Sequence, residues 1–486
     1  MKAAITILLL VNVGICHAAT TWYVSKSGSD SNSGKSESAA LLTIQKAIDK
    51  AAANDTILVA KGTYSYITIP ASKRGLTVKA TGSVADSVIK GASGHRCVTI
   101  GDGSTTNIYV VGFTLTSGSL SGSGNCGAGA MGGTYSNCVI TANSSGSLTT
   151  GSGAYKCTLN NCTISNNTCS DWTGGIEDCI ANKCTISGNK STNVGAGGAK
   201  NCMLTECTIS GNTAKSGGGG AQGCTSYRCV FKNNTCTSNS DAGNELNGGV
   251  AYDCIVNVRN RAISAASCYN CTIVSTSGSP GIWRATSLYN CIVSSSGNSF
   301  TINGDSNWSV KLYNCLLNNV SLGTYVTKTS CTTANPKFVS NSDYHLQAGS
   351  PCIDKGNNSY VSTTTDYAGN VRIRNSKVDI GAYEYYVSCT VEDVSASQRY
   401  PWNGLVDVKF KIGGESGAKY NVSLSARDVI GGTNVAMKTV RKKDQSAVNV
   451  AGAQIAPGTY NWIWDAAADL PKGWKCDRVT VKVSAE

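Results

Sequence analysis

The 486-residue chain is 14% charged and contains 54 glycines but only 7 prolines. Glycine at this density weakens helices, and the 41% apolar content argues against disorder, so the composition excludes a helical bundle and an unfolded chain. The net charge of +12, from 41 basic and 29 acidic residues, is a mild bias toward acidic partners such as anionic polysaccharide, and we expect no nucleic-acid partner.

The first 18 residues predict a secretory signal peptide. Lys2 precedes an apolar run from Ile5 to Val11, and small residues stand at the expected cleavage point before Ala19. No later segment is apolar enough to span a bilayer, and no anchor is evident. We therefore expect a secreted or cell-surface protein without a membrane span.

Residues 19–62 predict a cap that precedes a repeat. In the segment LLTIQKAIDKAA, one helical face collects apolar residues, which suits a helix that covers the open end of a first coil: Ile44, Ala47, Ile48 and Ala51.

Residues 97–331 contain a cysteine-rich repeat. Two cysteine series advance in parallel steps of 22, 23 and 22 residues, and each repeat opens with glycines and places an apolar residue two positions after its second cysteine. The first series is Cys157, Cys179, Cys202 and Cys224, and the second is Cys162, Cys184, Cys207 and Cys229. A period near 22 with short β-type segments predicts a solenoid in which each repeat forms one coil.

Within each coil, the second cysteine and the apolar residue two positions later share a face of a strand and are expected to point inward. Five asparagines at the repeat period predict a ladder at a turn: Asn143, Asn167, Asn189, Asn212 and Asn234. The residue before the second cysteine alternates in charge and predicts an outward column that fixes register: Lys183, Glu206, Arg228 and Asp253.

Residues 387–486 differ in composition from the repeat. Alternating segments such as VDVKFKI from Val406 and VTVKV from Val479 predict an immunoglobulin-like β-sandwich, in which Cys389 and Cys476 form a candidate disulfide. Four tryptophans are candidates either for a sugar-binding platform or for the core: Trp402, Trp462, Trp464 and Trp474.

The repeats resemble right-handed parallel β-helix proteins of the pectin-lyase-like superfamily. The Gly-Gly entry with Thr-Ile-Ser-x-Asn is similar to the repeats of polymorphic outer membrane proteins, and WYVSKSGSDSNSG from Trp22 is similar to the start of secreted bacterial β-helices. The segments DYHLQAGSPCIDKG from Asp343, DYAGNVR from Asp366 and DIGAYE from Asp379 resemble the closing region, here residues 335–386, of the choice-of-anchor Q proteins. The resemblance implies an all-β fold over residues 19–386 and leaves function open, because this superfamily holds lyases, hydrolases and inert adhesins.

The 22 cysteines that follow the signal peptide allow three interpretations: small apolar packing residues, disulfides between coils, or a metal site. Packing accounts best for inward columns. No histidine accompanies the Cys-x4-Cys spacing, so we expect no metal site.

A catalytic site is not evident in the sequence. A β-helix lyase needs a basic residue to take a proton beside a uronate carboxylate, and often Ca²⁺, so Ca²⁺ is expected only if the protein is a lyase. The candidate bases are Arg259, Arg261, Arg284 and Lys156, and the candidate carboxylates are Asp171, Glu177, Asp178, Asp241, Glu245 and Asp253. A glycoside hydrolase needs two facing carboxylates, for which Asp171 and Asp178 are the candidates.

A tyrosine stands two residues before the second cysteine in five successive coils: Tyr227, Tyr252, Tyr269, Tyr289 and Tyr313. These rings form a ligand-binding file if a bend turns them outward, and an internal stack if the segment is straight; the internal stack is the simpler interpretation. We therefore predict a monomeric, non-catalytic adhesin-like protein without a cofactor that binds polysaccharide or another cell-surface component. The alternatives are a polysaccharide lyase or glycoside hydrolase, and a structural surface-layer component.

Overall fold

The computed structural model describes residues 18–103, 107–122, 126–238, 243–278, 280–284, 286–374, 376–386, 389–400, 403–414, 419–428, 434–435, 437–444, 446–449, 453–470 and 479–485. The chain divides into two compact units, Met1–Tyr385 and Tyr386–Glu486, one residue before the predicted boundary. The predicted signal peptide lies outside the described residues except for its last residue.

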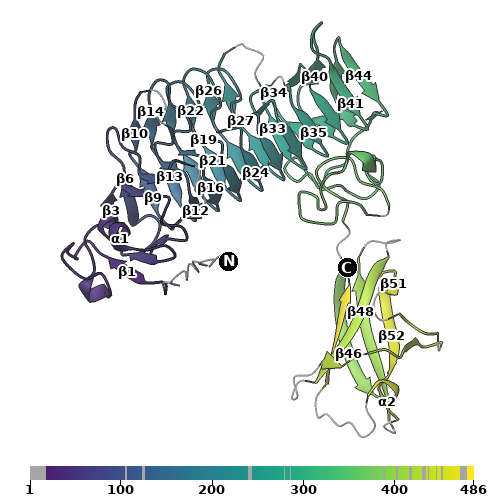
Figure 1. The fold of residues 1–486 in the computed structure, drawn as a ribbon. Coiled ribbons are helices and arrows are strands. Elements are labelled where there is room, and N and C mark those ends of the chain that lie inside the picture. The colour runs from purple at the N-terminus through teal and green to yellow at the C-terminus, as the bar shows by residue number, and fades with distance from the viewer. Residues whose placement is uncertain are drawn as a thin grey trace, which may run out of the picture. The chain divides into compact units, whose positions relative to one another are not determined.

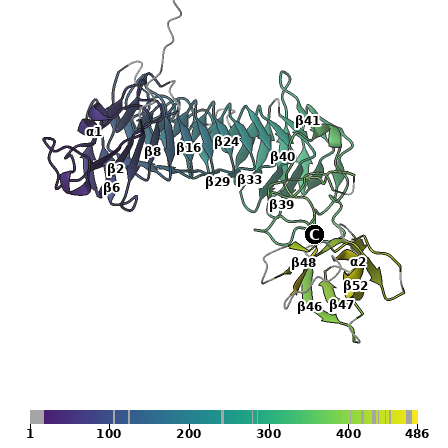
Figure 2. The same ribbon diagram turned by 60° about the horizontal axis from the view of Figure 1, so that its bottom comes forward.

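The first unit is a parallel β-solenoid built from three long sheets, as the repeat predicts (Figure 1). Successive strands in each sheet come from successive coils, so every pair is parallel and separated by one turn of the chain. Viewed from the second direction, the coils stack as a single row (Figure 2). The all-β fold class is confirmed.

The first sheet has 14 strands, which are β1(Thr21–Val24), β2(Thr56–Val59), β5(Thr77–Ala80), β8(Tyr109–Val111), β12(Thr134–Ser136), β16(Thr158–Asn160), β20(Ile180–Asn182), β24(Met203–Thr205), β28(Thr225–Tyr227), β32(Val250–Tyr252), β35(Ser267–Tyr269), β38(Ser287–Tyr289), β41(Val310–Tyr313) and β44(Val326–Thr329).

The second sheet has 13 strands, which are β3(Gly62–Ser65), β6(Ser87–Lys90), β9(Thr114–Thr116), β13(Val139–Thr141), β17(Thr163–Ser165), β21(Thr185–Ser187), β25(Thr208–Ser210), β29(Val230–Lys232), β33(Ile255–Val258), β36(Thr272–Ser275), β39(Ile292–Ser295), β42(Leu316–Asn318) and β45(Thr332–Thr333).

The third sheet has 12 strands, which are β4(Ile67–Ile69), β7(Val98–Ile100), β11(Ala130–Met131), β15(Ala154–Tyr155), β19(Ile176–Glu177), β23(Ala199–Lys200), β27(Ala221–Gln222), β31(Leu246–Asn247), β34(Arg261–Ser264), β37(Gly281–Trp283), β40(Phe300–Asn303) and β43(Val320–Leu322). A fourth sheet of six short strands extends some coils and comprises β10(Ser119–Leu120), β14(Ser144–Ser145), β18(Thr168–Cys169), β22(Lys190–Ser191), β26(Thr213–Ala214) and β30(Thr235–Cys236).

Many corners of the coils are a single residue with left-handed backbone, followed by an inward side chain. In the coil around β28, Gly223 (φ +63°), Arg228 (φ +49°) and Asn233 (φ +58°) form the three corners. They precede the inward residues Cys224, Cys229 and Asn234, which are all buried. A corner of this kind breaks the two-residue alternation of a strand, so the residue just before it points outward.

The predicted asparagine ladder is confirmed. The backbone N–H and the side-chain amide of Asn167 both donate to Oδ1 of Asn189, at 3.1 and 2.9 Å, and the pattern repeats from Asn143 to Asn234. The ladder asparagines are themselves inward and buried, and the left-handed residue is the one before each, such as Gly188. A Cβ on Gly198 would lie 3.0 Å from the Asn212 amide nitrogen, so the glycine entry makes room for the ladder.

The predicted cap helix is α1(Ile44–Lys50), which begins after Thr43, whose hydroxyl accepts from the Lys46 N–H at 3.3 Å. Ile44, Ala47 and Ile48 are buried in the solenoid core, as their spacing predicts. Two short 3₁₀ helices, η1(Glu37–Ala39) and η2(Asn358–Tyr360), complete the helices of this unit.

Residues 335–385, here called the closing segment, pack on the outside of the second sheet beside the last coils (Figure 1). Outward residues of β33, β36, β39 and β42 are apolar here and form two clusters with the segment. The first cluster contains Ile255, Val274, Tyr344, Ala382 and Tyr383, and the second contains Ile292, Leu316, Leu346, Cys352 and Ile380.

The second unit has two antiparallel sheets around one core. One sheet comprises β46(Thr390–Gln398), β47(Leu405–Gly413), β52(Gly458–Asp465) and β50(Val440–Lys442), and the other comprises β49(Asn434–Val435), β48(Tyr420–Asp428), β51(Ala453–Ile455) and β53(Val479–Ala485). Helix α2(Ala466–Asp469) follows β52. Trp462 and Trp464 are buried in the core, so these two residues do not form a sugar platform. Trp402, Trp474 and Cys476 lie outside the described residues, and so does the second half of the predicted Cys389–Cys476 pair.

Candidate functional site

Five tyrosines form a continuous stack along the first sheet. Tyr227, Tyr252, Tyr269, Tyr289 and Tyr313 end five hydrogen-bonded strands, and neighbouring ring centroids lie 5.0, 5.1, 4.6 and 5.0 Å apart. Each ring lies within 18° of parallel to the next. We call this set the Tyr row.

The Tyr row points outward because each tyrosine precedes a left-handed corner. Tyr227 is followed by Arg228, and Tyr269 is followed by Asn270 (φ +50°) before the inward Cys271. The interpretation as an internal stack is therefore wrong. The tyrosines remain partly exposed, with their ring faces against one another and their edges available at the surface.

The surroundings of the Tyr row are polar on one side and aromatic on the other. The ring centroid of Tyr360 in the closing segment lies 4.9 Å from that of Tyr289, and the two ring planes meet at 51°. On the open side, Ser267 and Ser287 occupy neighbouring outward positions of β35 and β38. Burial raises the pKa of Tyr252 and Tyr269, and each hydroxyl has a side-chain hydrogen-bond partner, which is Ser362 for Tyr252 and Tyr289 for Tyr269.

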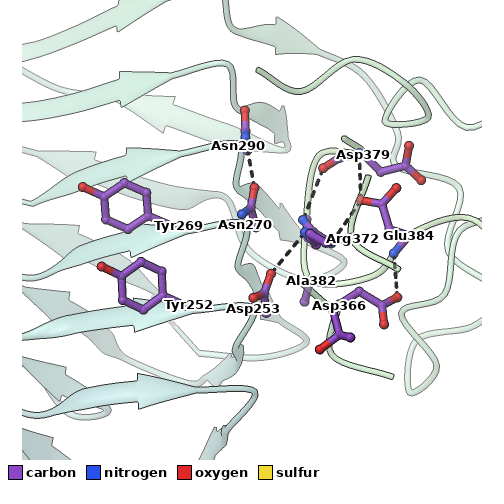
Figure 3. Close-up of polar contacts among 12 residues, drawn as sticks. Tyr252, Asp253, Tyr269, Asn270, Asn290, Asp366, Arg372, Asp379, Ala382 and Glu384 are labelled. Atoms are coloured by element: carbon purple, nitrogen blue, oxygen red, sulfur yellow. Dashed lines mark hydrogen bonds and ion pairs between the residues drawn. The ribbon is translucent and has the colours of Figure 1, made fainter. Parts of the chain in front are cut away.

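The closing segment is fixed beside the Tyr row by a buried charged cluster, which we call the Arg372 cluster (Figure 3). Nε of Arg372 lies 3.2 Å from Oδ1 of Asp253 at a coil corner, and Nη1 lies 3.3 Å from Oε1 of Glu384. Nη2 of Arg372 donates to the carbonyl of Gly381 at 2.5 Å. These three side chains are at most 2% exposed. Asp253 was predicted to be outward and paired within its column; it is buried instead, because Arg372 reaches it from the closing segment.

Two further carboxylates hold the backbone of the same segment. Asp366 accepts from the N–H groups of Asn370 and Glu384, at 2.7 and 2.9 Å. Asp379 accepts from the N–H groups of Asp354 and Tyr385, at 2.7 and 2.6 Å. Of these four buried carboxyl groups, Asp253 and Glu384 pair with the guanidinium, and the other two hold backbone N–H groups.

Burial raises the pKa values of Asp253, Glu384 and Asp379. The pKa of Asp253 rises to about 7 and that of Glu384 to about 8, in each case because desolvation outweighs the attraction of Arg372. Desolvation also raises the pKa of Asp379. Protons shared within the cluster therefore offset its excess of carboxylates.

The predicted carboxylate candidates occupy three different environments. Glu177 is buried and bound to Lys200 at 3.2 Å and to the Thr173 hydroxyl at 2.6 Å. Asp171 accepts from the Leu148 N–H and from the Asn193 amide, both at 2.9 Å. Asp178 is an exposed corner residue. The hydrogen bonds of Asp171 lead toward neighbouring coils, and none joins it to Asp178.

The predicted basic candidates lie elsewhere on the solenoid. Arg261 lies over the Trp283 ring at 5.3 Å, Arg284 pairs with Asp305 at 2.9 Å, and Arg259 is exposed. Lys156 is an exposed corner residue beside Tyr155. Asp241 lies outside the described residues.

Glu245 ends the asparagine ladder and is buried. Its two carboxylate oxygens accept from the backbone N–H and the amide of Asn234, at 3.2 and 2.5 Å, and burial raises its pKa to about 8. Leu246 pairs with Ala221, so Glu245 occupies the position of Gly220 in the coil before. The next ladder position holds the exposed Arg259 instead of asparagine, so the ladder ends at Glu245. The loss of both glycine and asparagine in one repeat was a signal that the sequence interpretation missed.

The cysteine columns are buried packing residues. The cysteines of both columns are buried thiols, and the backbone N–H of Cys184 donates to Sγ of Cys207 at 3.4 Å. The same contact links other coils, such as Cys162 to Cys184 and Cys229 to Cys254. Within the described residues, no group of three or more metal-binding side chains is arranged to hold a metal ion. No helix among them is long and apolar enough to cross a membrane.

No family model matches the chain, and no curated protein matches it. Among solved structures, pectate lyase Pel9A is 16% identical, with a TM-score of 0.40 over 76% of this chain and 97% of that one. XylC in complex with xylose is 12% identical, with a TM-score of 0.46 over 75% and 99%. A rhamnogalacturonan lyase is 11% identical, with a TM-score of 0.29 over 74% and 96%.

Proposed function

We propose that this protein acts outside the cell or at its surface as a non-catalytic polysaccharide-binding β-helix. The Tyr row carries the proposal: five identical side chains repeat at 4.6 to 5.1 Å along one face. A row of identical groups at a fixed spacing suits a polymer of repeated units better than a single small molecule. Because the ring faces cover one another, the polymer would contact ring edges and hydroxyl groups.

The neighbouring serines extend this surface. Ser267 and Ser287 lie in adjacent strands beside the Tyr row, so hydroxyl groups line the face in two dimensions. The Arg372 cluster supports a binding role indirectly, because it fixes the closing segment and therefore Tyr360 against the row. A surface held in place before binding loses less conformational entropy when the ligand arrives.

The environments of the catalytic candidates favour binding over cleavage. Glu177 is committed to Lys200 and Thr173, and Asp253 is committed to Arg372. A lyase or hydrolase remains the second candidate, with Ca²⁺ as the expected cofactor in the lyase case. The release of a cleavage product would distinguish such an enzyme from a binding protein.

The test uses the chain from Ala19 onward and gels that contain polygalacturonate, alginate, xylan or β-glucan. We expect at least one polymer to retard the protein without shortening and without the ultraviolet absorbance of unsaturated uronates. Cleavage of any polymer overturns the non-catalytic assignment, and an unsaturated product identifies a lyase.

A triple variant tests the Tyr row itself. Tyr252→Phe, Tyr269→Phe and Tyr289→Phe together keep the stacked rings and remove three hydroxyl groups. We expect the affinity to fall at least tenfold, since each lost hydrogen bond contributes about 0.5–1.5 kcal/mol. The control is Tyr109→Phe, which makes the same change on the same sheet outside the row. Equal affinity of the triple variant and the parent protein means that the row only stabilises the fold.

A further inference from the structure

Three exposed apolar residues lie on adjacent coils, far from the Tyr row in sequence. Leu148, Trp172 and Val194 are 61%, 41% and 41% exposed. They occupy the turns from β14 to β15, from β18 to β19 and from β22 to β23. We call these three residues the Trp172 patch. Large apolar side chains gathered at a surface mark an interaction site more often than single ones do.

Hydrogen bonds hold the three turns together. The side chain of Asp171 accepts from the Leu148 N–H at 2.9 Å, and its backbone carbonyl accepts from the Val194 N–H at 2.7 Å. The backbone N–H of Trp172 donates to Sγ of the buried Cys169 at 3.2 Å. The exposure of Trp172 is therefore a property of a fixed turn.

One face of the Trp172 indole is already occupied. Nζ of Lys200, from β23, lies 4.5 Å from the ring centre and 3.2 Å from Oε1 of Glu177. The Lys200 and Glu177 side chains are only 16% and 10% exposed, so this cation–π contact is largely shielded from water. The ion pair with Glu177 holds Lys200 over one face of the indole, and Trp172 remains 41% exposed.

Polar acceptors border the same ring. Asp171 is partly exposed, and its hydrogen bonds with Asn193 and Leu148 lower its pKa, so it is a carboxylate at neutral pH. An ionised carboxyl group has about four lone-pair positions, of which the side-chain bonds to Leu148 and Asn193 use two. The patch thus joins an apolar ring surface to an acceptor with remaining capacity.

We propose that the Trp172 patch is a second glycan-binding site, at which one sugar ring stacks on the exposed indole and donates hydroxyl protons to Asp171. This inference rests on the proposed polysaccharide-binding function and adds a separate site to it. The apolar carbon–hydrogen face of a sugar ring matches the indole, and its hydroxyl groups match the polar border.

The size of the patch favours a sugar over a protein partner. Three neighbouring coils at a strand spacing of about 4.8 Å span about 10 Å. A stable protein interface needs about 800 Å² on each partner, which is far more than three side chains supply.

The two sites lie on different parts of the coils, because the Trp172 patch occupies turns that precede strands of the third sheet and the Tyr row lies on the first sheet. Lys200 is an outward residue of the third sheet, and the Tyr row belongs to the first sheet. Asn201 (φ +51°) forms the corner between them. Variants of the two sites therefore change different surfaces and separate the two hypotheses.

The experiment measures retardation of the chain from Ala19 onward in gels of polygalacturonate, alginate, xylan or β-glucan. We expect Trp172→Ala to lower the affinity for the bound polymer at least tenfold, and Trp172→Phe to lower it less. The matched control is Trp308→Ala, which removes an indole that is 51% exposed in another turn and should leave the affinity unchanged. Circular dichroism and thermal unfolding confirm that each variant keeps its fold.

Each outcome separates the site from the proposed function. If the triple Tyr→Phe variant loses affinity and Trp172→Ala does not, the proposed function stands and the second site is wrong. If only Trp172→Ala loses affinity, the second site stands without the Tyr row. Retardation by no polymer, or equal losses for Trp172→Ala and Trp308→Ala, overturns the inference. Self-association that Trp172→Ala abolishes, with no polymer binding, assigns the patch to a protein partner instead.

Discussion

The early and late coils of the solenoid keep the same register by different means. From β13 to β29, an internal ladder links Asn143 to Asn234, and the outward position on the second sheet is threonine in β17, β21 and β25. From β33 onward the ladder has ended, and the equivalent outward position carries Ile255, Ile292 and Leu316 under the closing segment, with Thr272 between the first two accepting from the Ala382 N–H. The late coils also carry the Tyr row on the first sheet.

This difference shows that a regular solenoid does not need one repeated stabilising device. Where the coil interior is wide enough for asparagine beside paired glycines, buried amides link the coils from inside. Where the glycines and asparagines disappear, Glu245 ends the ladder, and external packing takes over. Changes in one half should therefore leave the other half largely unaffected, because contacts in a solenoid are mostly between neighbouring coils.

The largest effect is expected from Arg372→Ala. The change leaves Asp253 and Glu384 buried without their guanidinium partner, and breaking a buried ion pair of this kind costs about 3–5 kcal/mol of unfolding free energy. Hydrogen exchange should accelerate across the closing segment and in β33, β36 and β39, and remain slow in β17, β21 and β25. The control Lys377→Ala removes an exposed charge from the same segment. Uniform acceleration along all coils would contradict the division into two halves.

Asn189→Ala tests the other half. The change removes the oxygen that accepts from the backbone N–H and the side-chain amide of Asn167. It also removes the amide that donates to the Ile164 carbonyl, and all of these groups are buried. Since each unsatisfied buried group costs about 1–3 kcal/mol, we expect a loss of about 3 kcal/mol in unfolding free energy. Exchange should accelerate in β17, β21 and β25 while the closing segment stays protected. Asn182→Ala is the matched control, because Asn182 belongs to an outward pair with Asn160.

Much of the first unit follows from the sequence because its determinants are local and repeated. The cysteine period gives the coils, the spacing of Cys184 and Ile186 gives the inward column, and Ile44 and Ile48 give the buried face of α1. The asparagine column is also evident, because one residue type recurs at one position. A pattern that recurs in many coils can be recognised in the sequence even where a single coil departs from it.

The outward direction of the Tyr row was harder to predict from the sequence, and so was the Arg372 cluster. Strand alternation places Tyr269 on the same side as Cys271, and only the left-handed Asn270 between them reverses this. Asparagine tolerates that backbone, but Arg228 and Asp253 occupy the same corner in other coils, so composition alone does not identify it. The partner of Asp253 comes from the closing segment, a contact that no local pattern encodes.

The pH dependence of stability sharpens the same comparison. Asp253 and Glu384 have folded-state pKa values of about 7 and about 8, against ordinary values of 3.8 and 4.5. Between pH 5 and 8 the folded protein holds protons that the unfolded chain releases, so the unfolding free energy falls as pH rises, by about 1.4 kcal/mol per pH unit for each proton held. Glu245, with a pKa of about 8, adds to the same trend from the end of the ladder.

Glu384→Gln isolates the contribution of Glu384 to the pH dependence of the unfolding free energy. The glutamine keeps an oxygen for the Asp379 N–H and removes one titrating group, so the slope of unfolding free energy against pH should decrease by about 1 kcal/mol per pH unit between pH 5 and 7. Denaturant titrations at pH 5, 6, 7 and 8 measure the slope. An unchanged slope would mean that Glu384 is ionised throughout this range.

The smallest effect is expected from Tyr269→Leu, which interrupts the Tyr row at its centre. The change removes ring stacking on both sides, at 5.1 Å from Tyr252 and 4.6 Å from Tyr289. Aromatic pairs contribute about 0.5–1.5 kcal/mol each beyond area burial, and leucine restores part of the packing, so we expect a loss of about 1 kcal/mol in unfolding free energy. Tyr109→Leu, on the same sheet and 39% exposed, is the control. If the two variants lose the same stability, stacking contributes nothing to register in the late coils, and their order depends on the closing segment alone.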